Sequence, residues 1–347
     1  MTRFESNSVV VGVACLTCLC RPPVDRLPAA VAHRCTAVAT CRAAGALGPG
    51  HDEPPAPVLG IPSTDRCTVP AGRAALHRSP RPTPVGVANV ARMSNLFDVS
   101  GKTVVVTGGS RGIGRMIAEG FVDGGATVYI SARKADACRQ TAEELSKRGS
   151  CTALPADLST EAGCRGLADA VAAREPKLDV LVNNAGATWG APLEQFDDAA
   201  WNRVLDLNVK GVFHVTKFLR QLLHKAGTEE NPSRVINIGS IDGIQVPLLE
   251  TYSYSASKAA VHQLTRHLAR YLAPRTTVNA IAPGPFESKM MAATLEAFGE
   301  HIAASAPLKR IGRPDDMAGT AIFLASRAGA YLTGAIIPVD GGIATVG

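Results

Sequence analysis

The stretch from Lys102 to Gly125, KTVVVTGGSRGIGRMIAEGFVDGG, restricts the possible folds more than any other part of the sequence. Its first six residues, KTVVVT, form a β-branched run that is typical of a strand buried on both faces. A glycine-rich turn follows directly, and the apolar pattern after it predicts a helix that ends at two glycines. Strand, glycine turn and helix in this order predict the first unit of a dinucleotide-binding fold.

Each glycine has a separate role in such a turn. Gly108 permits the tight turn, Gly112 lets the backbone approach a pyrophosphate, and Gly114 lets the helix pack closely on the strand. The helix amino terminus then points at the phosphates, where its free N–H groups favour an anion. The cofactor contacts predicted in this turn are those of Gly108, Ser110, Arg111, Gly112, Ile113 and Gly114.

The next strand indicates which dinucleotide is bound. An NAD site usually has Asp or Glu near the end of this strand to accept hydrogen bonds from the ribose 2′-hydroxyl. Here TVYISA, residues 127–132, is followed by Arg133 and Lys134, without an acid. Arg133 is placed to meet a 2′-phosphate, and Arg111 can face the same group. The sequence therefore predicts NADP(H) as the cofactor.

Strands and helices continue to alternate along the chain. This alternation predicts an α/β fold, a single doubly wound parallel-sheet (Rossmann) domain covering residues 93–347, with ligands at the carboxyl ends of the strands. The further strands are expected near residues 151–158, 178–186, 234–240, 276–284 and 335–342. The further helices are expected up to residue 174 and near residues 197–226, 252–273 and 314–325.

The segment YSYSASK, residues 252–258, contains two tyrosines close to a lysine. Residues four apart share one face of a helix, so Lys258 can reach the phenol of Tyr254 but not that of Tyr252. A nearby ammonium stabilises the phenolate and is expected to lower the pKa of Tyr254. Tyr254 can then exchange a proton with a carbonyl or alcohol oxygen, and Ser240, which follows a predicted strand, can hydrogen-bond the same oxygen.

With these motifs on the page, residues 96–342 resemble a short-chain dehydrogenase/reductase of the classical type. The resemblance runs through TGGSRGIG, DL, NNAG, LNVKG, the Ser-Tyr-Lys set, APG and VDGG. It implies that Asn208 is a catalytic asparagine that holds a water, and that Lys258 also holds the nicotinamide ribose. The catalytic residues that it implies are Asn208, Ser240, Tyr254 and Lys258. The additional cofactor contacts that it implies are Asp157, Leu158, Asn184, Tyr254, Lys258, Pro283, Gly284 and Phe286.

Within the family, NNAGATWGAPLE, ENPSRVINIGS and GAYLTGAIIPVDGG resemble bacterial 3-oxoacyl-acyl-carrier-protein reductases, particularly those of the rhamnolipid-precursor branch. The resemblance implies reduction of a 3-oxoacyl thioester, on acyl carrier protein or CoA, by a cytoplasmic homo-oligomer, a dimer or a tetramer, without nucleic-acid or membrane partners. Two alternatives stay open: a dehydrogenase or reductase of small free carbonyls, sugars, polyols or steroids, and a catalytically silent NADP-binding sensor or scaffold.

Three segments are expected to form the walls of the substrate pocket: residues 188–193, 243–251 and 286–306. They supply apolar side chains and few charges, which suits an alkyl chain. The residues predicted to line the pocket are Trp189, Ile244, Val246, Leu248, Leu249, Met290, Met291, Leu295 and Phe298.

Residues 1–92 differ from the rest in composition. They contain ten Arg, no Lys, one aromatic residue and Pro-rich runs such as SPRPTP, so we expect a disordered or non-functional extension. Beyond it, 26 Lys and Arg nearly balance 25 Asp and Glu, so the net charge of +6 is no nucleic-acid signature. A secretory or lipoprotein signal around Cys15, an organellar transit peptide and a metal site at Cys15, Cys18 and Cys20 are weaker alternatives.

Overall fold

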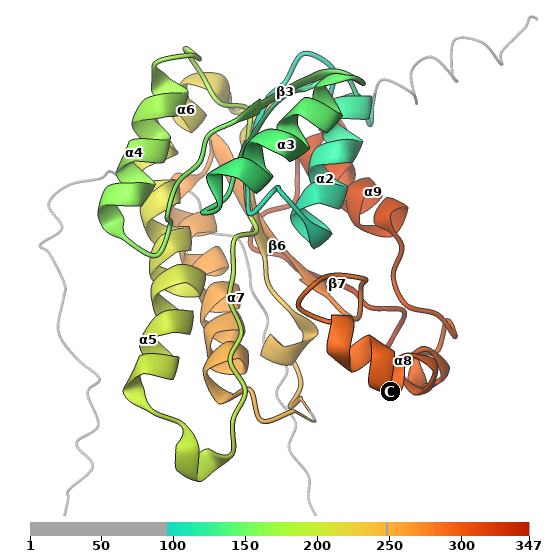
Figure 1. The fold of residues 1–347 in the computed structure, drawn as a ribbon. Helices are drawn as coiled ribbons and strands as arrows, with labels where there is room; N and C mark the ends of the chain where they lie inside the picture. The colour runs from blue at the N-terminus through green and yellow to red at the C-terminus, as the bar shows by residue number, and fades with distance from the viewer. Residues whose placement is uncertain (1–95, 248, 347) are drawn as a thin grey trace, which may run out of the picture. The chain divides into compact units, whose positions relative to one another are not determined.

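The computed structural model describes residues 96–247 and 249–346, which fold around one parallel sheet (Figure 1). The predicted domain start at Met93, the extension and its cysteines lie outside the described residues. The seven strands lie in the order β3-β2-β1-β4-β5-β6-β7, and all neighbours are parallel. Their bounds are β1 Thr103–Thr107, β2 Thr127–Ser131, β3 Ser150–Ala153, β4 Val180–Asn183, β5 Ser233–Ile238, β6 Thr276–Pro283 and β7 Ile336–Val339. The prediction of a doubly wound α/β fold is confirmed.

Helices cover both faces of the sheet. Figure 1 shows α2, α3 and α9 on one side of the sheet and α4, α6 and α7 on the other. The helix bounds are α2 Gly112–Asp123, α3 Ala135–Ser146, α4 Glu161–Ala172, α5 Asp198–Leu205, α6 Val212–Ala226, α7 Tyr252–Leu272, α8 Ala292–Ser305 and α9 Pro314–Ala325. Short turns of 3-10 helix are η1 Leu193–Gln195, η3 Ile241–Gly243 and η4 Arg327–Gly329, and η2 Asp206–Gly211 is a π-helix.

The core consists of two apolar layers, one on each face of the sheet. Along β1, Val104 and Val106 pack into the layer under α2 and α9, whereas Val105 packs into the layer under α4 and α6. This alternation follows from the period of two in a strand. Every residue of β1 is buried, which confirms that the β-branched run is a central strand.

The order of the strands in the sheet determines where a ligand-binding crevice can form. Sequential strands run outward from β1 in one direction up to β3, and the chain then crosses back to β4 on the other side of β1. Ligands of doubly wound folds bind in the crevice at such a switch point. The turn after β1 and residues 184–186 after β4 border this crevice. Within the residues that the structure describes, no helix has both the length and the apolar character needed to cross a membrane.

The helical prediction was wrong at one helix and did not include α3 or α8. The single helix expected over residues 197–226 is α5 and α6 joined by the π-helix η2, which carries Asn208. A π turn inserts one extra residue and often marks a functional position, but no sequence period signals it. Helix α8 occupies part of a segment that was expected only to form a pocket wall.

Candidate functional site

The turn after β1 has the backbone geometry that its glycines predicted. Gly108 and Gly112 have φ values of 67° and 53°, in the left-handed region. A Cβ on Gly108 would lie 2.7 Å from Nδ2 of Asn184, and a Cβ on Gly114 would overlap the same amide and the carbonyl oxygen of Gly108. Strand, turn and helix are therefore packed too closely for any side chain at these positions.

Asn184 braces this turn from the neighbouring strand. Its side-chain amide donates to the carbonyl oxygens of Thr107, at 2.9 Å, and Gly108, at 3.2 Å. Its backbone N–H donates to the hydroxyl of Thr107 at 2.9 Å. The family resemblance implied a cofactor contact for Asn184, and the structure adds that its amide holds the two strand ends together across the switch point.

The amino terminus of α2 is open to an anion. Its first turn contains no acidic residue, and the cap residue Arg111 makes no side-chain hydrogen bond to the helix. Thr141 fixes the turn by donating to the carbonyl oxygen of Ser110 at 3.1 Å, while Ile113 packs against the core. The free N–H groups and the helix dipole therefore face the crevice without a competing carboxylate.

Arg111, in the glycine turn, and Arg133, two residues after the end of β2, are both exposed. Neither forms an ion pair in the part of the chain that the structure describes. Asp157, beyond β3, accepts from the hydroxyl and N–H of Ser159; these hydrogen bonds lower its pKa, and Arg133 adds a smaller effect in the same direction. Leu158 beside it is buried in the core. Two guanidinium groups without an ion pair thus remain available, one in the glycine turn and one after β2.

Ser240, Tyr254 and Lys258 come together at the end of β5. Tyr254 and Lys258 lie one turn apart on α7, with the ammonium 5.4 Å from the centre of the phenol ring. The Lys258 ammonium donates to the carbonyl oxygen of Ile238 at 2.8 Å, two residues before Ser240. The Ser240 hydroxyl accepts from the N–H of Asp242 at 3.1 Å and hydrogen-bonds Tyr254. Tyr252 instead turns its phenol to Glu250, 3.3 Å away.

Asn208 connects this group to the strand end of β4. Its side-chain oxygen accepts from the N–H of Ala187 at 2.8 Å, and its amide donates to the carbonyl oxygen of Ala187 at 3.0 Å. The amide also donates to the Ser257 hydroxyl on α7 at 2.9 Å. Asn208 is 1% exposed, so the π-helix buries a side chain that ties three segments of the site together.

Burial dominates the protonation of the two ionisable groups. It raises the pKa of Tyr254 to about 12, although the Ser240 hydrogen bond acts in the opposite direction. It lowers the pKa of Lys258 to about 8, against the attraction of Asp242. The sequence led us to expect a lowered tyrosine pKa; the structure differs because desolvation of the phenolate outweighs the neighbouring groups. Tyr254 is therefore a protonated acid at neutral pH.

The segment after β6 joins the site through its backbone. Pro283 ends the strand, and a Cβ on Gly284 would lie 2.7 Å from Cβ of Asp340. Phe286 is 2% exposed: its ring packs against Gly312, and the backbones of the two residues form a parallel bridge. The side chain of Phe286 thus belongs to the core, and only its backbone can face a ligand.

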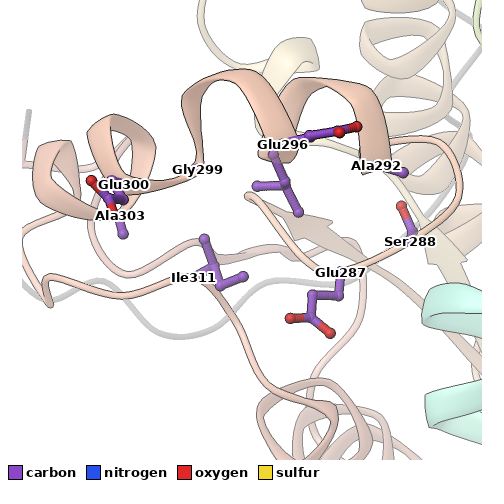
Figure 2. A pocket seen from close by; sticks show the side chains of 9 residues that line it. Glu287, Ser288, Ala292, Glu296, Gly299, Glu300, Ala303 and Ile311 are labelled. Carbon is purple, nitrogen blue, oxygen red and sulfur yellow. The ribbon is translucent and has the colours of Figure 1, made fainter.

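The predicted pocket walls are only partly assembled. Residues 188–193 and 249–251 lie together, since Ala191 donates to the carbonyl oxygen of Glu250 at 3.2 Å. A separate cavity of about 540 Å³ lies between the segment after β6 and α8 (Figure 2). Leu295 lines it, and Figure 2 shows its glutamates 287, 296 and 300 spread around it. Leu248 lies outside the described residues. The exposed members of the predicted set are Trp189, Ile244, Val246, Leu249, Met290 and Phe298.

Comparison with known proteins shows to which family a chain with this site belongs. The family model described as enoyl-(acyl carrier protein) reductase matches residues 108–344. The rhamnolipids biosynthesis 3-oxoacyl-[acyl-carrier-protein] reductase of Pseudomonas aeruginosa is 50% identical over 254 residues, which are 72% of this chain and 99% of that protein. The chain belongs to the short-chain dehydrogenase/reductase family.

Comparison with further family members shows which properties they share and which differ between them. The solved Pseudomonas aeruginosa RhlG/NADP active-site complex superimposes with a TM-score of 0.70 at 50% identity, covering 72% of this chain and 99% of that one. A galactitol 2-dehydrogenase of Cereibacter sphaeroides is 37% identical over 254 residues, which are 71% of this chain and 96% of that protein. The family and the fold are thus fixed, while its members act on substrates of different polarity.

One ionisable residue of the site escaped the sequence reasoning. Asp242 lies two residues after Ser240, is half-buried, and interacts electrostatically with both Tyr254 and Lys258. Its position close behind a strand-end serine was the available signal. An acid in a turn is so common on protein surfaces that this spacing alone carries little information.

Proposed function

We propose that this short-chain dehydrogenase/reductase uses NADPH to reduce a 3-oxoacyl thioester to the 3-hydroxyacyl thioester. The observation that carries the proposal is the position of Ser240, Tyr254 and Lys258 at the carboxyl end of β5, across the switch point from a glycine turn flanked by two unpaired arginines. The 50% identity to the Pseudomonas enzyme, over 99% of its length, supports the 3-oxoacyl substrate.

The cofactor cradle fits a dinucleotide phosphate. The positions of Gly108 and Gly114 exclude side chains, and the α2 terminus presents N–H groups without an acid. Arg133 and Arg111 would hold a 2′-phosphate, and a nicotinamide cofactor is seen as NADP in the Pseudomonas complex. When bound, NADPH supplies the hydride that the carbonyl carbon accepts.

The catalytic residues then divide the remaining work. The Tyr254 phenol, protonated at neutral pH, donates its proton to the carbonyl oxygen, and the Ser240 hydroxyl donates a hydrogen bond to the same oxygen. The Lys258 ammonium would stabilise the resulting phenolate, and it is the residue that would hold the nicotinamide ribose. Asn208 fixes residue 187 against α7, which positions the wall of the site beside Lys258.

Exposed apolar side chains favour a lipophilic substrate. Val246 is 91% exposed, Leu249 54% and Trp189 40%, on the two segments that flank the catalytic group. Covering large apolar surfaces beside a reactive site with a ligand removes them from water, which stabilises the complex. An acyl chain would cover these side chains, whereas a polyol would need several fixed hydrogen-bonding groups in their place.

A substrate panel tests this function. NADPH oxidation is followed with 3-oxoacyl-CoA, the matching N-acetylcysteamine thioesters, and free sugars or ketoses, and the alcohol product is identified by mass spectrometry. We expect kcat/KM for the thioesters to exceed that for the sugars by at least about 10²-fold. Preferred turnover of sugars or polyols would support the alternative that the galactitol dehydrogenase represents.

We also propose that the enzyme is a homo-oligomer. Phe213, Tyr271 and Tyr331 are large and exposed, at 42%, 72% and 103%, on α6, on α7 and after η4. Apolar side chains of this size are often covered by a second subunit. Light scattering of the purified protein tests this, and a monomer at micromolar concentration would refute it.

A further inference from the structure

The turn that carries Ser240 also places a carboxylate against the reaction centre. Residues 241–243 form the 3-10 turn η3, which packs on α7: a Cβ on Gly243 would lie 2.7 Å from the carbonyl carbon of Lys258. The Ser240 hydroxyl accepts from the N–H of Asp242 at 3.1 Å. The backbone of Asp242 therefore positions the serine, and its side chain has no hydrogen bond to the described residues that would fix it elsewhere.

Charge around the reaction centre is unevenly exposed. The Lys258 ammonium is buried, at 6% exposure, and is hydrogen-bonded to Ile238. Asp242 is half-buried; burial raises the pKa of its carboxyl group, and the attraction of Lys258 acts in the opposite direction. Of the two charged residues next to Tyr254, Asp242 is thus less buried than Lys258, so a substrate at Tyr254 would be more exposed to the negative charge than to the positive one.

This arrangement suits a 3-oxoacyl group whose carboxyl group is esterified and therefore carries no charge. In such a substrate the carboxyl carbon is only two bonds from the carbonyl that accepts the hydride. A thioester or ester is neutral there, whereas the free 3-oxo acid carries a carboxylate that would lie close to Asp242. Like charges at a few ångströms in a partly buried site repel strongly.

We propose that Asp242 is a specificity-determining residue that excludes free oxo acids and other anionic carbonyl substrates from the site. The inference rests on the proposed function, since it concerns the same reaction at Tyr254. It assigns selection against the unesterified acid to one side chain in η3, separate from the apolar walls that bind the acyl chain.

The test compares two substrates with one carbon skeleton, 3-oxobutanoate and its methyl ester. For each enzyme variant the ratio of kcat/KM for the acid to that for the ester is measured. Asp242→Asn keeps the backbone N–H that serves Ser240 and removes the charge, so we expect this ratio to rise at least about tenfold. Asp242→Glu keeps the charge and should keep the ratio low, and Asp242→Ser is a second neutral variant that should behave like Asn.

Glu250→Gln is the matched control for a carboxylate near the site. Glu250 is exposed and is the acceptor for the Tyr252 hydroxyl, so solvent screens its charge and the ratio should change less than about twofold. An unchanged ratio in both neutral variants, or equal losses for acid and ester, overturns the inference. If wild-type enzyme reduces neither esters nor thioesters, the proposed function itself fails, which is a different result.

Discussion

The cofactor half of the site and its substrate half are built differently. The cofactor half, defined as β1, the turn at 108–111, α2 and β2, has a fully buried first strand and five buried residues in α2. The substrate half, defined as residues 187–196, 244–251 and 286–311, contains α8, for which no buried residue is found among its described side chains. In the segment 244–251 of the same half, the side chain of Val246 is 91% exposed.

The difference shows how one enzyme combines a rigid site for the cofactor with an adaptable site for the substrate. In the cofactor half, backbone atoms approach so closely that Gly108 and Gly114 exclude any Cβ, and the geometry is set before a ligand arrives. In the substrate half, most large apolar side chains stay exposed, which is typical of segments that adapt to a ligand. Tyr254 and Lys258 stand between the halves, on a helix that packs against the sheet.

The largest expected effect is on kcat/KM when Tyr254, which lies between the two halves, is changed. Tyr254→Phe removes the proton donor, so kcat/KM should fall by about 10³-fold or more, while the Kd for NADPH changes less than about threefold. Stopped-flow reduction and fluorescence titration measure the two quantities. Tyr252→Phe is the control and should retain most activity, because its hydroxyl faces Glu250. An inactive Tyr252→Phe beside an active Tyr254→Phe would reverse the assignment.

A change confined to the cofactor half should alter cofactor choice alone. Arg133→Asp replaces a cation with a carboxylate that repels a 2′-phosphate and can accept from a 2′-hydroxyl. We expect the ratio of kcat/KM for NADPH to that for NADH to fall about 10²-fold. Arg139→Asp is the matched charge reversal on α3; Arg139 already pairs with Asp136, and it should leave the ratio nearly unchanged. A wild-type preference for NADH would contradict the assignment.

The same contrast explains what the sequence could predict. The cofactor half was predictable because it is local: the KTVVVT run, the glycine spacing and the apolar period of α2 lie within 24 consecutive residues. Even the spacing of Tyr254 and Lys258 needed only the geometry of one helix. Their union with Ser240 followed from the rule that strand ends of a parallel sheet meet on one side.

What escaped prediction depends on tertiary packing. On the π-helix, the Asn208 side chain hydrogen-bonds Ala187 and Ser257, which are distant in sequence, so no local pattern reports its position. The raised pKa of Tyr254 depends on burial, which no spacing reports. Helix α8 lacks a strong amphipathic pattern because little of it packs against the core, so the pattern that identified α2 was missing there.

The pH profile tests the border between the halves. The pKa of Lys258 is lowered to about 8, so its ammonium is present below that value and is lost above it. The pKa of Tyr254, near 12, keeps the phenol protonated throughout. We expect kcat/KM for reduction to be flat below pH 8 and to fall up to about tenfold per pH unit above it. Constant activity up to pH 10 would show that the charge of Lys258 is not needed.

The smallest expected effect concerns the substrate half alone. Burial of one methylene is worth about 0.8 kcal/mol, so each carbon added to a 3-oxoacyl N-acetylcysteamine thioester should raise kcat/KM about threefold to fourfold, until the chain outgrows the apolar walls. Arg133→Asp should leave this slope unchanged, since it acts in the other half.

Two exposed wall residues allow the slope itself to be altered. The double variant Val246→Ser with Leu249→Ser removes apolar surface next to the catalytic turn and should reduce the gain per carbon to below about twofold. Tyr331→Ser, an exposed aromatic outside the three segments, is the control; it should leave the gain per carbon intact even where it weakens association between subunits. A profile that is flat in the wild type would mean that these side chains serve another surface, and the substrate half would then have to be sought around the cavity under α8.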